Sequence, residues 1–196
     1  MITANVPIEA TLEQPSTIEP VYMLRFIDGG FGWEMPIAQT IECVLEGDEL
    51  IYIPNYFKAY ELVDKDTFDR LGAQSFLLFA PEALIMLDDL RVYFGVPITV
   101  NNWFTGGPFS RRGFRTLLDE LAVNPKSTGH SAHQTGLAFD FDVEGMTAED
   151  VRGHIIADKD SPRLRNITRL EAGTSWVHAD CLPLPYNVNR IHLFSA

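Results

Sequence analysis

Apolar positions recur with a helical or strand period only beyond residue 60 of this chain. The segment Asp64–Gly72 predicts a short helix that ends at Gly72. Pro81–Tyr93 has a proline in its first turn and leucines at three-residue spacing, which predicts a helix that stops at Gly95. Pro97–Val100 then predicts a strand, and Arg112–Ala122 predicts another short helix.

Two later segments alternate between apolar and polar residues. In Leu137–Val143 the bulky apolar side chains occupy one face of a strand, and Asp140 lies on the other face. Trp176–Asp180 alternates in the same way and places His178 at the centre of a second core strand. Between these segments, Thr147–Asp150 has the sequence of a capping box and predicts the start of a helix.

The first part of the chain gives weaker signals. Residues 1–19 are polar and contain prolines, which predicts an irregular arm. Residues 20–60 carry short apolar runs broken by turns, including the strand-like Leu50–Ile53, and are predicted to be rich in β-structure. We therefore expect an N-terminal extension over residues 1–55 and one folded domain over residues 56–196.

Composition limits the possible partners. The formal net charge is −12, from 27 acidic and 15 basic side chains, and argues against nucleic acid or an anionic membrane as a partner bound by charge. The N-terminus lacks the basic start and apolar core of a secretory signal. No stretch approaches the ~20 apolar residues of a membrane-spanning helix. We expect no signal peptide and no membrane or nucleic-acid partner.

Three residues carry the most specific chemistry. His133, Asp140 and His178 offer two imidazoles and one carboxylate, a set that suits a catalytic Zn²⁺ and leaves a fourth position for water. The spacing of the first two suits a loop that turns at Gly136 and enters a strand. Asp140 can then pair across to His178 on a neighbouring antiparallel strand.

The segments that hold these residues resemble a known family. Ser131–Asp140 has the form S-x-H-x-x-G-x-A-x-D, and Trp176–Asp180 has the form W-x-H-x-D. Both are similar to the ligand motifs of the zinc D-Ala-D-Ala carboxypeptidases and peptidoglycan endopeptidases, the M15 peptidases. The resemblance covers roughly residues 60–182. It implies an α+β fold of the Hedgehog/DD-peptidase type, a small antiparallel sheet flanked by helices.

The same resemblance implies a function. A phage-type member would hydrolyse a peptide bond in peptidoglycan stem peptides, using Zn²⁺ to activate water. Without a secretory signal, such an enzyme would be cytoplasmic until its release during lysis, or would be associated with the virion. The bond cleaved, and carboxypeptidase or endopeptidase action, stay open.

No motif residue identifies the catalytic carboxylate as clearly as the metal ligands are identified. Many of these peptidases have a glutamate three residues before the last histidine, where this chain has Ser175. Glu171 is the nearest upstream acid, and Gly173 permits a turn that could bring it to the metal. Asp180 is the alternative, because it shares a strand face with His178. 

Substrate recognition also needs a cation for a peptide carboxylate. Arg112 and Arg115 are the candidates, since arginine binds carboxylates through two parallel hydrogen bonds. They lie in a segment of the form N-N-W-x-x-G-G-x-x-x-x-R-G-x-R, which resembles a variant found in phage-borne members. Ser131 can either donate a hydrogen bond to substrate or brace its loop.

Two other functions remain open. One is a non-catalytic phage or wall-binding structural protein that retains a structural metal site, and the absence of a glutamate at Ser175 favours it. The other is a non-haem Fe(II) oxygenase, because two histidines and one carboxylate also form that site. Its first histidine and carboxylate are usually two residues apart, and the separation here argues against it.

Overall fold

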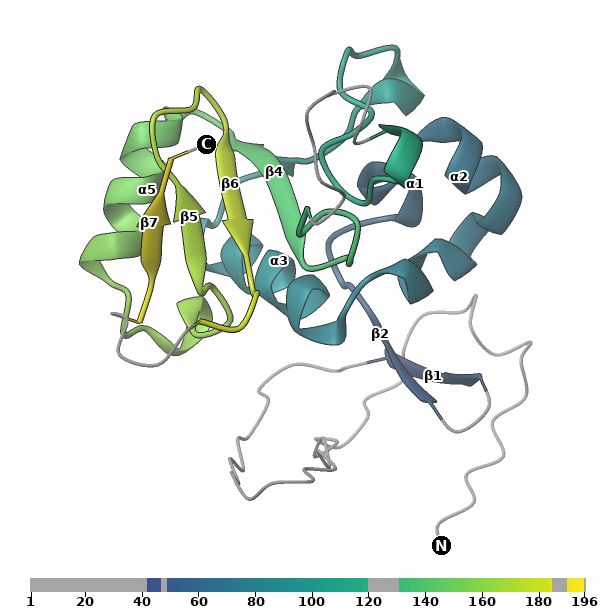
Figure 1. The fold of residues 1–196 in the computed structure, drawn as a ribbon, viewed down its shortest axis with the longest axis horizontal. Helices are drawn as coiled ribbons and strands as arrows, with labels where there is room; N and C mark the ends of the chain where they lie inside the picture. Colours follow the sequence, from purple (N-terminus) through teal and green to yellow (C-terminus); the bar gives the residue numbers. More distant parts are fainter. Residues whose placement is uncertain (1–41, 47–48, 120–130, 185–189, 196) are drawn as a thin grey trace, which may run out of the picture. The chain divides into compact units, whose positions relative to one another are not determined.

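The computed structural model describes residues 42–46, 49–119, 131–184 and 190–195 (Figure 1). The chain divides into two units, residues 1–41 and residues 42–196, and every described residue belongs to the second. The predicted irregular arm therefore lies outside the described residues. The proposed boundary between residues 55 and 56 stays a prediction.

A hairpin opens the described part of the chain. Strands β1 (Glu42–Glu46) and β2 (Glu49–Ile53) pair antiparallel in a two-stranded sheet of their own. The strand predicted over Leu50–Ile53 is confirmed. The carboxylate of Asp88 ties the end of this hairpin to the next part of the chain, since it accepts hydrogen bonds from the Tyr52 hydroxyl at 2.8 Å and from the Asn55 backbone at 2.7 Å.

A run of helices follows, and both predicted helices are confirmed. The helical segments are α1 (Ala59–Leu62), α2 (Lys65–Leu71), the 3-10 helix η2 (Gly72–Leu78) and α3 (Pro81–Phe94). The side chain of Asp64 caps α2 by accepting from two backbone N–H groups, and Gly72 ends the helix. Gly95 ends α3 in the left-handed conformation, with φ of +69°.

Helix α3 is the core helix of the domain. Its leucines Leu84, Leu87 and Leu90 are almost fully buried, as their spacing predicted. No single helix in the described ranges is long and apolar enough to cross a bilayer; the bent pair 65–78 and 81–94 passes that test only when its two arms are taken together.

The main sheet has five strands in the order β3-β4-β6-β5-β7. Their bounds are β3 (Ile98–Thr99), β4 (Ala138–Val143), β5 (Arg169–Glu171), β6 (Val177–Asp180) and β7 (His192–Phe194). The neighbouring pairs are antiparallel except β5 and β7, which are parallel. The α+β class agrees with the prediction, but the expectation of a wholly antiparallel sheet is wrong at this pair. Both edges of β6 are occupied by β4 and β5, so the returning strand pairs with the free edge of β5 and runs parallel to it.

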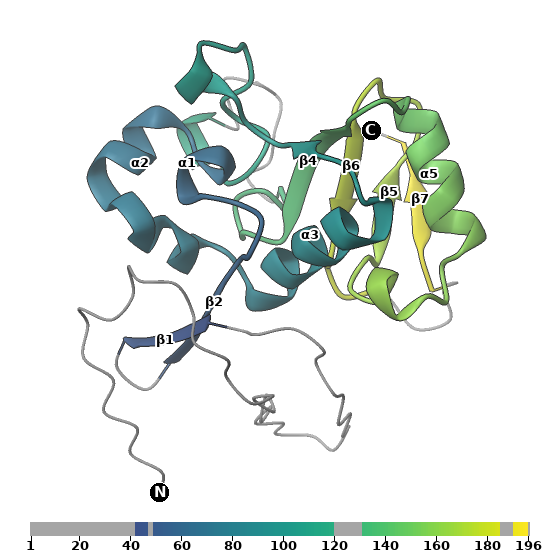
Figure 2. The same cartoon turned by 180° about the vertical axis from the view of Figure 1, so that it is seen from behind.

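The two faces of the sheet differ in character. Phe139 and Phe141 of β4 are fully buried on the face that α3 and α5 (Ala148–Ala157) cover (Figure 2). Helix α5 begins with the predicted capping box, in which Thr147 and Asp150 bond each other's backbone. The short 3-10 helix η4 (Pro162–Leu164) follows it. By strand alternation, the opposite face carries Asp140.

The helix predicted over 112–122 is wrong at its start. Among the described residues only 117–119 are helical, and the 3-10 helix η3 (Trp103–Thr105) precedes them. Backbone bonds of the intervening segment go to distant partners instead: Phe114 N–H donates to Leu62 O at 3.0 Å, and Arg115 N–H donates to His133 O at 3.3 Å. These long-range bonds replace the helical ones.

Glycine at position 136 is required where the chain enters β4. Its φ is +65°, and a Cβ there would lie 2.0 Å from the Leu78 carbonyl oxygen. Gly145, with φ of +76° and no atom within 4 Å of a Cβ, is a matched control. A left-handed conformation costs an L-residue about 1–2 kcal/mol.

We therefore expect Gly136→Ala to lower the free energy of unfolding by more than about 2 kcal/mol, and Gly145→Ala by about 1 kcal/mol. Chemical denaturation of the two variants measures both values. Equal destabilisation would show that Leu78 can move aside, and that the close approach at Gly136 does not hold the turn.

Candidate metal centre

Three polar side chains from two segments meet at one point, on the face of the sheet opposite α3 and α5. The β4–β6 ladder pairs Asp140 directly with His178, and the turn before β4 brings His133 to them. His178 Nδ1 lies 2.8 Å from Asp140 Oδ1 and 3.2 Å from His133 Nε2. His133 Nε2 lies 3.3 Å from Asp140 Oδ1. All three residues are buried, with exposed fractions of 2–7%.

These separations fit a tetrahedral metal. Bonds of 2.0–2.1 Å to nitrogen and oxygen put tetrahedral ligand atoms about 3.3–3.4 Å apart. The two separations from His133 Nε2 match this value, and the third is that of a hydrogen bond. The three residues, with one ligand atom each, can therefore hold one metal ion. The same set fits a three-ligand site with one further position.

Hydrogen bonds on the outer side of each ring decide which ring nitrogen faces inward. His133 Nδ1–H donates to the Gly113 carbonyl at 2.8 Å, which leaves Nε2 with a lone pair. His178 Nε2 lies 3.2 Å from Asp180 Oδ2, which in the same way leaves Nδ1 as the inner atom. Two nitrogen lone pairs and one carboxylate oxygen of Asp140 then converge. Three buried acceptors at this distance require a cation between them.

In the metal-free protein that cation is a proton. Burial alone would lower the pKa of His178, but its hydrogen bonds with Asp140 and Asp180 outweigh burial and raise the pKa to about 9. Burial lowers the pKa of His133, so this ring stays neutral. Burial would raise the pKa of Asp140, yet its two histidine partners hold it well below its usual range. A proton on His178 Nδ1 thus occupies the place that a metal would take.

The segment before β4 supports the ligands from outside. Arg115 donates to the second oxygen of Asp140, so only Oδ1 is directed at the metal position. The Asp140 N–H donates to Arg112 O at 2.7 Å. The Arg112 guanidinium pairs with Asp142 at 2.5 Å and lies over the Phe109 ring, 3.4 Å from its centroid. The two arginine side chains are 12–16% exposed. Their role in binding a substrate carboxylate stays a prediction.

Ser131 contacts the turn that carries His133. The backbone N–H of His133 donates to Ser131 Oγ at 3.3 Å, and Gln134 exchanges hydrogen bonds with the Ser131 backbone. Ser131 is therefore positioned to brace its loop. A contact of Ser131 with substrate stays a prediction.

Glu171 and Asp180 differ sharply in their surroundings. Asp180 is fully buried and its carboxylate accepts from Arg169, Leu182 and His178. Glu171 lies two residues beyond Arg169 on β5, and so shares the face on which Arg169 meets Asp180. It is half-buried, and no hydrogen bond or ion pair joins its carboxylate to another residue of the described ranges. Of the two, only Glu171 has a carboxylate not already engaged there.

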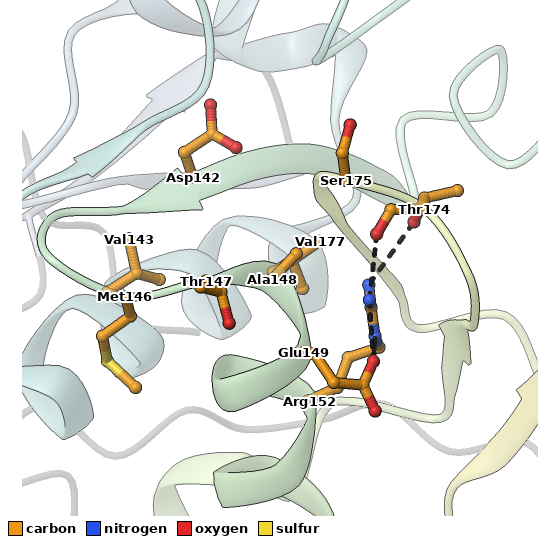
Figure 3. A pocket seen from close by; sticks show the side chains of 10 residues that line it. All are labelled: Asp142, Val143, Met146, Thr147, Ala148, Glu149, Arg152, Thr174, Ser175 and Val177. Atoms are coloured by element: carbon orange, nitrogen blue, oxygen red, sulfur yellow. Dashed lines mark hydrogen bonds and ion pairs between the residues drawn. The ribbon is translucent and has the colours of Figure 1, made fainter.

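A cavity of about 420 Å³ lies beside the sheet (Figure 3). The first turn of α5 lines it together with Val143 and Val177, whose side chains alternate with those of the metal centre and so face the helices. Arg152 closes one side, and its guanidinium bonds Glu149 and the Thr174 carbonyl. None of the three candidate ligands lines this cavity, so it is separate from the candidate metal centre.

Two supporting groups were not expected from the sequence. The Gly113 carbonyl carries no side-chain signal at all, although Gly113 itself is required, because a Cβ there would lie 1.8 Å from Leu62 O. No motif marks Arg169, although its spacing of two residues from Glu171 predicts that both side chains lie on one face of a strand.

Searches of protein-family models, of curated proteins and of solved structures each found no match to this chain.

The geometry predicts one metal ion per chain. His133→Ala, Asp140→Ala and His178→Ala should each reduce bound zinc to near zero, since each removes one of three ligands. Metal content after dialysis measures this, and His154→Ala, an exposed histidine of α5, is the control. A variant that keeps full zinc occupancy would remove its residue from the ligand set.

Zinc affinity should also depend on pH. Because the pKa of His178 is about 9 in the metal-free protein, zinc must displace a proton at every pH below that value. We expect affinity to rise about tenfold per pH unit from pH ~6 to ~8, and about one proton to be released per zinc ion. Titration calorimetry in buffers of different ionisation enthalpy counts the protons. An affinity that does not change over this range would contradict displacement of a proton from His178.

Proposed function

We propose that the protein is a zinc-dependent hydrolase that cleaves a peptide bond in peptidoglycan stem peptides. The single observation that carries this proposal is the convergence of His133 Nε2, Asp140 Oδ1 and His178 Nδ1 within hydrogen-bonding distance of one another. Peptidoglycan as substrate, the phage-type origin and the Hedgehog/DD-peptidase fold rest on the resemblance of the two ligand segments to the zinc DD-peptidases.

Zinc is the metal that this donor set suits best. Two imidazole nitrogens and one carboxylate oxygen are typical of catalytic zinc sites, which leave one position for water. The same donors also bind Fe(II) in oxygenases. A bound zinc ion would lower the pKa of its water to about 7 and polarise the carbonyl of the scissile bond.

The chain's own residues would supply the remaining functions. Glu171 is the proposed general base. It lies on the same face of the β5–β6 pair as His178, and its carboxylate bonds no other residue in the described part of the chain. Asp180 is a poorer base because its oxygens already accept from Arg169 and Leu182. Arg115 holds Asp140 with one oxygen inward, and either Arg115 or Arg112 could in addition meet a carboxylate of the stem peptide.

A second candidate function has its own support. The ligands are only 2–7% exposed, which also suits a closed structural metal site in a non-catalytic phage or wall-binding protein. The serine at position 175, where many zinc DD-peptidases have the catalytic glutamate, points the same way. Activity decides between the two functions, because both predict bound metal.

The test is digestion of purified peptidoglycan by the zinc-loaded protein. We expect mass spectrometry to detect stem-peptide fragments that disappear when a chelator is added and return with zinc. Glu171→Gln should retain zinc but lower turnover by roughly 100-fold or more, as for loss of a general base.

Glu144→Gln, an exposed acid in the turn after β4, is the matched control and should digest normally. Near-normal turnover in Glu171→Gln would remove this residue as the base. A zinc-loaded wild type that cleaves no peptidoglycan type would overturn the hydrolase proposal in favour of a structural metal site.

A further inference from the structure

Arg169 and Asp180 form a buried ion pair that the proposed hydrolysis does not use. The ladder between β5 and β6 pairs the two residues directly. Arg169 Nε donates to Asp180 Oδ1 and Oδ2 at 2.9 Å, and its Nη2 donates to Oδ2 at 2.7 Å. Asp180 is fully buried, and the Arg169 side chain is 28% exposed. The carboxylate is thus held in one orientation beside the metal centre.

The remaining contacts of Asp180 point to His178. Leu182 N–H donates to Asp180 Oδ1 at 3.1 Å, and His178 Nε2 lies 3.2 Å from Oδ2. An ionised carboxylate only accepts hydrogen bonds, so the hydrogen between them is on His178 Nε2. Asp140 Oδ1, 2.8 Å from Nδ1, is an acceptor in the same way, so the metal-free ring carries a hydrogen on that side too. A metal bound at Nδ1 would replace that hydrogen and leave the one that Nε2 donates to Asp180.

Phe194 packs against both Arg169 and His178. The Arg169 guanidinium lies over the Phe194 ring, 4.9 Å from its centroid. The His178 ring meets Phe194 edge-on, with centroids 5.7 Å apart. Strand β7 holds Phe194 in place by its parallel pairing with β5. The histidine, the carboxylate and the guanidinium are therefore fixed by one strand ladder and one aromatic ring.

We propose that Arg169 and Asp180 are positioning residues that fix His178 in the tautomer whose Nδ1 faces the metal. The proposal rests on the metal centre of the proposed function, and not on the reaction. The substitution Asp180→Asn removes the negative charge and keeps nearly the same side-chain shape. Both Asp180 oxygens accept from Arg169, and Oδ2 also faces His178 Nε2. An amide has one acceptor oxygen and an N–H group in their place, so it cannot accept from all of these donors.

A merely structural ion pair would tie β5 to β6 without affecting the metal. The chain offers a matched control in Arg163, which donates to Asp89 at 2.7 Å and belongs to no part of the metal centre. Arg163 and Asp89 have exposed fractions of 37% and 11%. Arg163→Gln should therefore lower thermal stability while zinc affinity stays at the wild-type value.

The test measures zinc affinity by competition with a chelator, and the imidazole tautomer by nitrogen-15 NMR. We expect Asp180→Asn and Arg169→Gln to weaken zinc binding by about 10- to 100-fold, the usual effect of losing an outer partner of a metal-bound histidine. In the zinc form of the wild type the imidazole N–H of His178 should be on Nε2, where Asp180 accepts it, with Nδ1 bound to the metal.

Wild-type zinc affinity in both variants, with the N–H still on Nε2, would overturn the proposal. If Asp180→Asn does not fold, Arg169→Gln alone decides, because it leaves Asp180 in place. A wild type that binds zinc but cleaves nothing removes the hydrolase function and leaves these readouts unaffected. If the wild type binds no zinc, the proposed function and this proposal both fail.

Discussion

The structure depends on the close approach of three buried acceptor atoms on one face of the β4–β6 pair. Lone pairs on two histidines and one aspartate do not converge in a protein interior without a cation between them. The antiparallel register sets Asp140 against His178, and the left-handed turn at Gly136 returns His133 to the same place. The loop ending at Arg115 then closes over the ligands with backbone and side-chain bonds.

The buried carboxylates near the candidate metal centre are paired with arginines. Asp140 and Asp180 are both buried and ionised, and each is met by one arginine, Arg115 or Arg169. Removing one member of a buried pair typically costs about 3–5 kcal/mol, because the other charge is left without a partner. The two arginines therefore stabilise the buried, ionised forms of Asp140 and Asp180. This local balance exists within a chain of net charge −12.

Much of the site follows from strand alternation, which the sequence displays directly. Asp140 and His178 lie at the centres of two alternating segments, and their pairing needed only the assumption of adjacent antiparallel strands. The supporting contacts could not be predicted in this way. The Gly113 carbonyl has no side chain to mark it, and β5 has only three residues, too few for a recognisable period. Long-range backbone hydrogen bonds replace the helix predicted to begin at Arg112. Strand β7 pairs with β5 because that strand has a free edge, which the sequence pattern does not reveal.

The most direct test of this account is a crystal structure of the zinc-loaded protein with anomalous scattering measured at the zinc edge. We expect one strong anomalous peak about 2.0–2.2 Å from His133 Nε2, Asp140 Oδ1 and His178 Nδ1, with Asp180 still bonded to Nε2 of His178. A peak elsewhere, or coordination of His178 through Nε2, would contradict it.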